Sequence, residues 1–201
     1  MNARVTLPDR TFGGYIFDLD GTLVDSMPTH YKAWRWALQK NGAPHEVFLW
    51  DEFVSHGGMA APDIVADLNR TYGLHMKPQT VATQKRERYD YLLETETLPV
   101  IPETVGLVRQ LQADGIPYAI GTGSAIAGAR ATLRSAGIGD LFSIIVTPDD
   151  VPPGRGKPEP DIFLLAAERM GVAPAECVVF EDAEPGIRAA QAAGMAHVRV
   201  Y

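Results

Sequence analysis

The sequence has a single cysteine, Cys177, so a disulfide within the chain is excluded and nothing requires an oxidising compartment. No apolar run approaches the length of a membrane span, and residues 1–10 lack the apolar core of a signal peptide. Low-complexity segments and internal repeats are also missing. We therefore expect a globular protein of the cytoplasm that has no membrane partner.

Basic residues are fewer than acidic residues. The chain has 18 Lys and Arg against 25 Asp and Glu, a formal net charge of −7, which gives no basic surface for nucleic acid. An acidic protein can still bind an acidic substrate where a metal ion, a lysine or helix N-termini supply local positive charge. With 201 residues, 46% of them hydrophobic, the chain can form one substantial core and a smaller unit.

The order of apolar segments indicates an α/β fold. A short apolar run at residues 15–17 is followed by helical spacing over residues 28–98, with no clear strand in between. Later, short apolar runs alternate with amphipathic stretches, which predicts a parallel sheet with helices on both faces. The expected further strands are 117–120, 142–146, 177–180 and 197–200. The expected helices are 103–113, a helix that follows the second strand and runs through residue 133, 161–170 and 185–193. The helical stretch is then a second, smaller domain.

Two aspartates, Asp18 and Asp20, end the first expected strand and precede Gly21. Open α/β sheets bind ligands at the carboxyl ends of their strands. One aspartate can attack as a nucleophile while the other moves a proton, or both can hold a divalent cation. Because an Asp-x-Asp-Gly turn is also ordinary loop chemistry, this pair alone leaves both interpretations open.

Three further expected strands are followed by polar turns. These turns are Gly121-Thr122-Gly123-Ser124, Gly156-Lys157-Pro158 and Glu181-Asp182. The hydroxyls and backbone amides of the first suit an anion such as phosphate. Because the carboxyl ends of parallel strands lie at one edge, we predict that all four clusters converge on one crevice.

Each polar turn also has a plainer interpretation. Thr122 and Ser124 are typical turn or helix-capping residues, and most lysines, like Lys157, lie on the surface. Glu181 and Asp182 are acids of the kind favoured at a helix N-terminus. These interpretations explain poorly why all the turns occur together at successive strand ends, so the pattern favours one site.

In order and spacing, these motifs resemble the four-motif signature of the haloacid dehalogenase superfamily. The matching segments are Asp18-Leu19-Asp20-Gly21-Thr22, Thr122, Lys157-Pro158 and Glu181-Asp182. The resemblance covers essentially the whole chain and is strongest to the β-phosphoglucomutase subgroup, which also contains sugar-phosphate phosphatases. It implies a Rossmann-like catalytic core of residues 1–27 and 99–201 and an inserted α-helical cap of residues 28–98.

The resemblance also implies roles for these residues in a phosphatase. Asp18 would attack phosphorus to form an aspartyl-phosphate, and Asp20 would protonate the leaving oxygen and later deprotonate water. The expected Mg²⁺ ligands are Asp18, the backbone carbonyl of Asp20, Asp182 and, through water, Glu181. The expected phosphate-binding residues are Thr122, Lys157 and their neighbours Gly123 and Ser124.

Substrate choice is expected to lie in the cap, because a small open site needs a lid that excludes water and contacts the leaving group. By resemblance, His30 lies near the acid/base aspartate and Lys85 reaches the substrate, although each is equally well explained as a helix-surface residue. The segment His56-Gly57-Gly58-Met59 resembles the cap loop that contacts sugar in this subgroup. Its glycines would allow close backbone approach.

Two departures from the mutase pattern favour hydrolysis. β-Phosphoglucomutases have an arginine shortly after the cap-loop glycine, where this chain has residues 59–63 without one. They also have a lysine after the second-motif turn, where this chain has Ala125. The turn 121–124 and the segment 179–183 look more like bacterial phosphatases acting on fructose-1-phosphate and similar small phosphates.

The expected function is therefore Mg²⁺-dependent hydrolysis of a small phosphorylated metabolite, in particular a sugar phosphate, by a monomer. A β-phosphoglucomutase is the first alternative, and a non-catalytic module that binds a phosphorylated ligand is the second. Dehalogenases of this fold lack the second acid of the first motif, so Asp20 disfavours that chemistry.

Overall fold

The computed structural model describes residue 5, residues 10–57 and residues 59–201. The chain divides into two compact units, one of Met1–Ser26 with Thr97–Tyr201 and the other of Met27–Glu96. Across the described residues, no helix has both the length and the apolar content that crossing a membrane requires.

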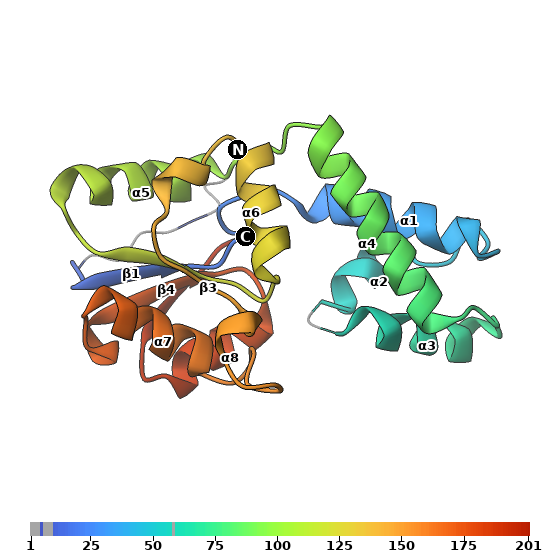
Figure 1. Cartoon of the computed structure of the whole chain (residues 1–201). Helices are drawn as coiled ribbons and strands as arrows, with labels where there is room; N and C mark the ends of the chain where they lie inside the picture. The colour runs from blue at the N-terminus through green and yellow to red at the C-terminus, as the bar shows by residue number, and fades with distance from the viewer. Residues whose placement is uncertain (1–4, 6–9, 58) are drawn as a thin grey trace. The chain divides into compact units, whose positions relative to one another are not determined.

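The first unit contains a five-stranded parallel sheet of order β3-β2-β1-β4-β5. Its strands are β1 (Gly14–Phe17), β2 (Tyr118–Gly121), β3 (Ile145–Val146), β4 (Cys177–Glu181) and β5 (Ala196–Arg199). Its helices are α5 (Pro102–Asp114), α6 (Ile126–Ser135), α7 (Asp161–Met170) and α8 (Glu184–Ala192). Helices α5 and α6 lie on one face of the sheet, and α7 and α8 lie on the other (Figure 1). The predicted α/β fold is therefore confirmed.

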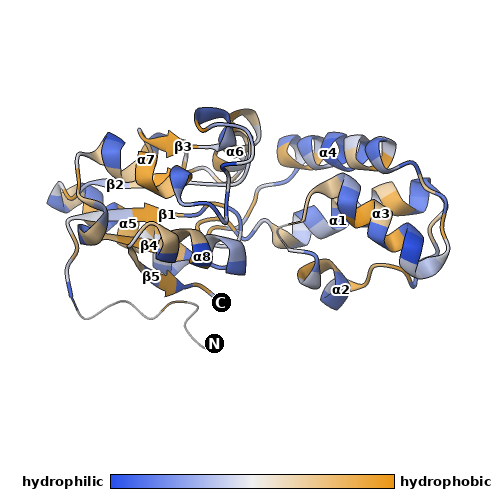
Figure 2. Cartoon of the chain, turned by 90° about the horizontal axis from the view of Figure 1, so that it is seen from below, coloured by the Kyte–Doolittle hydropathy of each residue, from blue (hydrophilic) through white to orange (hydrophobic). Residues whose placement is uncertain are grey.

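The sequence pattern explains why the sheet forms here. Strands β1 and β4 are buried along their whole length, as expected for parallel strands covered on both faces. In Figure 2 the hydrophobic colour is concentrated in the strands, while the helices combine hydrophobic and hydrophilic stretches. Phe163 and Ala166 of α7 pack on Ile16, Ala119 and other buried residues of the sheet, which fixes the strand ends where the polar turns begin.

The third strand is shorter than predicted. A single 3₁₀ turn at Gly139–Leu141 precedes it, and only Ile145 and Val146 pair with β2 in sheet register. The predicted strand over residues 142–146 was therefore wrong at its beginning. Ser143 is exposed, and because β3 lies at the edge of the sheet, only one side of it has a partner strand.

The second unit is entirely helical over its described residues. Its helices are α1 (Met27–Lys40), α2 (Trp50–Ser55), α3 (Ala61–Tyr72) and α4 (Pro78–Thr95). Trp34 of α1, Leu68 of α3 and Val81 of α4 belong to one buried cluster, so the helical spacing seen in the sequence corresponds to a separate hydrophobic core. This unit is inserted directly after the loop that follows β1.

Candidate active site

The loop after β1 begins with Asp18, whose backbone N–H donates to the carbonyl of Phe180 at 2.9 Å. Gly21 then has a φ of +87°, a left-handed conformation that favours glycine. A Cβ on Gly21 would also overlap the carboxylate of Asp182. The glycine of the first motif therefore makes the turn possible and leaves room for an acid from another strand end.

A lysine lies between two buried carboxylates at this edge of the sheet. Lys157 Nζ donates to Asp18 Oδ1 at 2.6 Å and to Glu181 Oε2 at 2.7 Å. The exposed fractions of these side chains are 10% for Lys157, 9% for Asp18 and 2% for Glu181. Charges held this far from water interact strongly, because little solvent screens them.

The pKa values show how crowded the negative charge is. Burial raises the pKa of Asp18 well above its ordinary value, and the charge of Glu181 adds to this rise, while Lys157 opposes it. Burial and the charge of Glu181 raise the pKa of Asp182 to about 7. Burial alone would lower the pKa of Lys157, but the charges of Asp18 and Glu181 outweigh burial and raise it.

The acids also form a possible metal site. One carboxylate oxygen from each of Asp18, Glu181 and Asp182 can be chosen so that all three lie within 4.8 Å of one another. Carboxylate oxygens are the hard donors that Mg²⁺ prefers. Three acids face one lysine, so a divalent cation would balance the remaining charge, and the donor set fits such an ion. The predicted ligand from Asp20 is a backbone carbonyl, which is not part of this carboxylate cluster.

The carboxylate of Asp20 accepts two hydrogen bonds from hydroxyl groups. Ser26 Oγ donates to Oδ1 at 2.6 Å, and Ser124 Oγ donates to Oδ2 at 2.8 Å. Ser124 itself is positioned by its backbone N–H, which donates to Thr122 Oγ1 at 3.0 Å. The structure therefore links the first-motif loop to the turn after β2. Buried Ser26 is a contact that the sequence did not indicate, because a serine between two motifs carries no pattern.

The turn after β4 is held by hydrogen bonds between its backbone and two side chains. The N–H of Ala183 donates to Glu181 Oε1 at 3.0 Å, and Arg199 donates to the carbonyl of Asp182 at 2.9 Å. Gly186, in the first turn of α8, approaches Glu181 so closely that a Cβ there would overlap the carboxylate. Gly186 and Arg199 thus support the acidic pair, and neither was predicted as a site residue.

Two of the residues predicted for the cap, His30 and Lys85, lie together in the helical unit. Lys85 Nζ donates to His30 Nδ1 at 2.9 Å, which leaves the ring proton on Nε2. The His30 ring stacks on the Tyr89 ring with a centroid distance of 3.8 Å. Lys85 Nζ lies 5.1 Å from the centroid of the Tyr89 ring. The structure therefore unites these two residues around one tyrosine.

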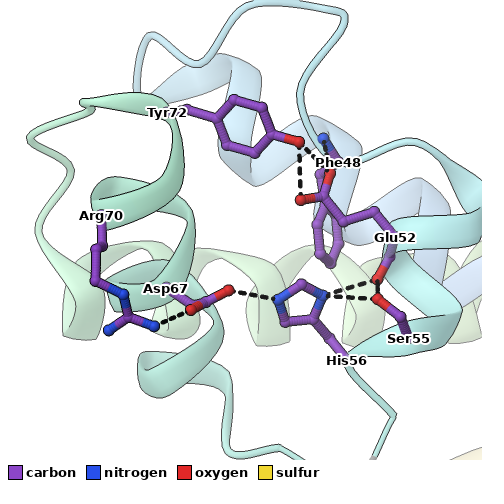
Figure 3. Close-up of polar contacts among 7 residues, drawn as sticks. All are labelled: Phe48, Glu52, Ser55, His56, Asp67, Arg70 and Tyr72. Atoms are coloured by element: carbon purple, nitrogen blue, oxygen red, sulfur yellow. Dashed lines mark hydrogen bonds and ion pairs between the residues drawn. The ribbon is translucent and has the colours of Figure 1, made fainter.

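His56 is held by acceptors within the helical unit (Figure 3). Its Nδ1 lies 2.7 Å from the carbonyl oxygen of Glu52, and its Nε2 lies 3.0 Å from Asp67 Oδ2. Because both nitrogens face acceptors, the ring is best satisfied as an imidazolium. His56 thereby anchors the start of the predicted sugar-contacting loop. Gly57 lies at this start, whereas Gly58 lies outside the described residues.

Comparison with known proteins points to one family. The family model for haloacid dehalogenase-like hydrolases matches residues 12–194. The fructose-1-phosphate phosphatase YqaB of Escherichia coli (strain K12) is 39% identical over 191 residues, which are 94% of this chain and 96% of that protein. The hexitol phosphatase A of the same organism is 38% identical over 182 residues, which are 90% of this chain and 79% of that protein.

Among solved structures, a haloacid dehalogenase family hydrolase from Deinococcus radiodurans is similar over most of its length. Its TM-score is 0.76 at 31% identity, and the match covers 94% of this chain and 80% of that one. That crystal structure contains bound phosphate and sodium. The similarity extends over both units of the present chain.

Proposed function

We propose that this chain, which belongs to the haloacid dehalogenase-like hydrolases and is a phosphatase of that family, hydrolyses the monophosphate of a small sugar or sugar alcohol through an aspartyl-phosphate. The observation that carries the proposal is the contact of Lys157 with both Asp18 and Glu181, with Asp182 alongside. The two bacterial relatives above support the choice of sugar and hexitol phosphates.

Asp18 is the proposed nucleophile. Its carboxylate follows β1 directly and is fixed at Oδ1 by Lys157, which leaves Oδ2 to attack phosphorus. The attack forms an acyl phosphate and replaces one difficult displacement by two easier steps. Lys157 and the Thr122 turn would hold the phosphoryl oxygens. Phosphoryl transfer depends mainly on such positioning and charge neutralisation.

Asp20 is the proposed acid and base. It would give a proton to the leaving alcohol oxygen and later take one from the water that attacks the aspartyl-phosphate. Its two oxygens accept hydrogen bonds from Ser26 and Ser124, which fix the orientation of the carboxylate. The two serines therefore keep Asp20 in place between turnovers.

We also propose that the acidic cluster holds Mg²⁺, through Asp18, Asp182, the carbonyl of Asp20 and, by way of water, Glu181. When bound, the ion would neutralise charge on the phosphoryl oxygens. Asp18 and Asp182 must lose their protons for this, which their raised pKa values oppose and the cation favours. Activity that persists in excess EDTA would contradict this part of the proposal.

The helical unit is the proposed cap, with His30, Lys85 and the loop after His56 as substrate-binding residues. A mutase must hold a second phosphate, and this chain has no arginine at residues 59–63 and has Ala125 after the phosphate turn. Net hydrolysis of a monophosphate needs neither cation. The sequence therefore favours a hydrolase over a β-phosphoglucomutase.

One experiment tests the function directly. Purified protein with Mg²⁺ is incubated with a panel of sugar, hexitol and other small phosphates, and phosphate release is measured beside conversion of glucose 1-phosphate to glucose 6-phosphate. We expect release from sugar or hexitol phosphates and no interconversion. Interconversion without release would make the protein a mutase, and binding without either reaction would make it a non-catalytic module. An Asp18→Asn variant is the control for contaminating phosphatases.

A further inference from the structure

A cavity of about 600 Å³ lies in the sheet unit between α6, the segment of residues 139–150 and the end of α7. This volume is within the range of small-molecule binding sites, about 300 to 1,000 Å³. None of the residues to which the proposed function assigns a role lines the cavity. It is therefore a separate feature of the fold, next to the edge strand β3.

Three arginines line the cavity. Arg130 and Arg134 come from α6 and Arg169 from α7. The first two are four residues apart, so they lie one helical turn from each other on the same face, where like charges are unfavourable. Within the part of the chain that the structure describes, neither of these two guanidinium groups has a hydrogen bond or ion pair. Neither of these two cations is therefore held in an ion pair, although three aspartates also line the cavity.

The aspartates of the wall are largely engaged elsewhere. Asp150 forms an ion pair with Arg169, at 2.6 Å between Oδ1 and a guanidinium nitrogen, and its Oδ2 accepts from Thr147. Asp149 Oδ2 accepts from the backbone N–H of Ile126 at 2.9 Å. Asp140, in the 3₁₀ turn before β3, also lines the cavity; it is exposed and can accept a hydrogen bond from a ligand hydroxyl group.

Apolar side chains complete the lining. Leu133 and Phe142 are buried, and Ile144 is half-buried. A cavity of this kind can hold the carbon skeleton of a ligand while a few polar groups fix its orientation. The combination of two guanidinium groups that form no ion pair, one exposed acceptor and an apolar wall matches a small organic molecule that carries an anionic group.

We propose that this cavity is a second binding site, for a small organic phosphate, in which Arg130 and Arg134 bind the phosphate group. A guanidinium group donates two parallel hydrogen bonds to phosphate oxygens, and two such groups one turn apart can bind one dianion together. Asp140 then accepts from a hydroxyl group of the bound molecule, and the apolar wall covers its carbon atoms.

The position of the cavity suggests a connection to the active site. Helix α6 begins two residues after Ser124, and the N–H of Ile126 at its start is bound by Asp149 of the cavity wall. Strand β3, whose Ile145 also lines the cavity, ends at Val146, which accepts the N–H of Thr122 at 3.0 Å. A ligand that shifts α6 or β3 would therefore move the turn that we propose to bind the substrate phosphate.

Binding can be measured residue by residue, without any activity. Isotope-labelled protein in EDTA is titrated with inorganic phosphate, fructose 1-phosphate and citrate, and amide NMR shifts are followed. We expect two groups of shifts with different midpoints, one around Thr122 and Lys157 and one over residues 139–145. The second group should respond to fructose 1-phosphate more strongly than to citrate.

The variant R130Q/R134Q separates the two sites. We expect the midpoint for residues 139–145 to rise about tenfold or more, because each charge-assisted hydrogen bond contributes substantially, while the midpoint around Thr122 is unchanged. Arg109→Gln, at an exposed position on α5, is the matched control and should change neither midpoint.

Two results would overturn the proposed site, and a third would overturn its assignment to phosphates. The first is the absence of shifts at residues 139–145 in the unaltered protein at about 10 mM of each ligand, since weaker binding is not specific recognition. The second is an unchanged midpoint at these residues in R130Q/R134Q. Stronger binding of citrate than of fructose 1-phosphate would overturn the assignment to phosphates. Each of these results leaves the proposed phosphatase activity untouched.

Discussion

Lys157 Nζ lies 2.6 Å from Asp18 Oδ1 and 2.7 Å from Glu181 Oε2, so one ammonium group bridges acids from two different strand ends. This bridge explains how a chain with a net charge of −7 keeps several carboxylates together at one edge of a sheet. The same ammonium group supplies the positive charge that a phosphate dianion needs on approach. Stability and substrate binding therefore depend on one side chain.

Replacing Lys157 by Met should destabilise the protein. The substitution leaves two buried carboxylates without their counter-charge, a change that typically costs about 3 to 5 kcal/mol. Part of this loss should be recovered with Mg²⁺, because the ion would compensate the same carboxylates. Chemical denaturation in EDTA and in Mg²⁺ measures both effects.

Lys32→Met is the matched control for this experiment. Lys32 pairs with Glu96 at 2.9 Å, but the side chains are 57% and 37% exposed. Exposed ion pairs contribute about 0 to 1 kcal/mol, so this variant should unfold almost like the unaltered protein. Equal losses in the two lysine variants would show that burial of the Lys157 bridge does not matter.

Asp18→Asn should reduce turnover at least about a thousandfold, because an amide cannot act as the nucleophile. The fold should persist, since Asn has nearly the same size and relieves the repulsion from Glu181 that contributes to the raised pKa of Asp18. Steady-state phosphate release and thermal unfolding test the two statements. Asp114→Asn, at the exposed end of α5, is the control, and similar turnover in the two variants would refute the assignment of the nucleophile.

The main features of the fold were predictable because they depend on pattern. The buried runs that became β1 and β4 are continuous and apolar, and α7 occupies the expected residues 161–170. The edge strand β3 was overestimated, since an apolar stretch next to a 3₁₀ turn resembles a longer strand. Local sequence does not show how many residues of an apolar stretch pair with a neighbouring strand.

Contacts that depend on tertiary geometry could not be predicted. The approach of Gly186 to the Glu181 carboxylate joins α8 to the end of β4, and a glycine in a helix start has no distinctive pattern. Likewise, the partner of His56 is Asp67, 11 residues further along the chain and on another helix. The resemblance predicts a loop residue that contacts the substrate, and the structure adds that its ring nitrogens are bound within the helical unit.

Gly186→Ala should disturb the acidic pair without any backbone strain of its own. The new Cβ would overlap the Glu181 carboxylate, which is buried and bound to Lys157, so the carboxylate must move. We expect a loss of about 1 to 3 kcal/mol in the free energy of unfolding. We also expect weaker Mg²⁺ binding, so that half-maximal activity requires a higher Mg²⁺ concentration.

Gly128→Ala provides the comparison for Gly186. Gly128 lies inside α6, and a Cβ there would have no neighbour within 4 Å. Because Ala is favoured over Gly in a helix, this variant should gain about 0.5 to 1 kcal/mol. Denaturant midpoints of the two variants should therefore move in opposite directions, and movement in the same direction would contradict the steric argument.

The pair of His56 and Asp67 should make stability depend on pH. Burial lowers the pKa of His56, but hydrogen bonds to the Glu52 carbonyl and to Asp67 outweigh burial and raise it above the ordinary 6.5. The hydrogen bond from His56 lowers the pKa of Asp67 below 3.8; burial opposes this shift, and the charges of Arg70 and His56 add to it. In the folded protein both side chains are therefore charged between pH 3.8 and pH 6.5.

The sign of the effect follows from the two shifts. A raised histidine pKa stabilises the fold below pH 6.5, and this contribution disappears as the pH rises through the folded value. A lowered aspartate pKa stabilises the fold above pH 3.8, and this contribution disappears as the pH falls through the folded value. The coupling of the two residues should therefore be largest near about pH 5 and decline above about pH 7.

A double-mutant cycle of His56→Gln and Asp67→Asn measures this coupling, because it removes the separate contribution of Arg70 to Asp67. Urea unfolding of the four proteins at several pH values should give a coupling energy that falls as the pH rises from about 5 to 8. His45→Gln, at an exposed position, is the control for histidine replacement and should leave the coupling between His56 and Asp67 unchanged. A coupling energy that is constant or increases over this range would mean that the imidazolium form of His56 does not hold the loop.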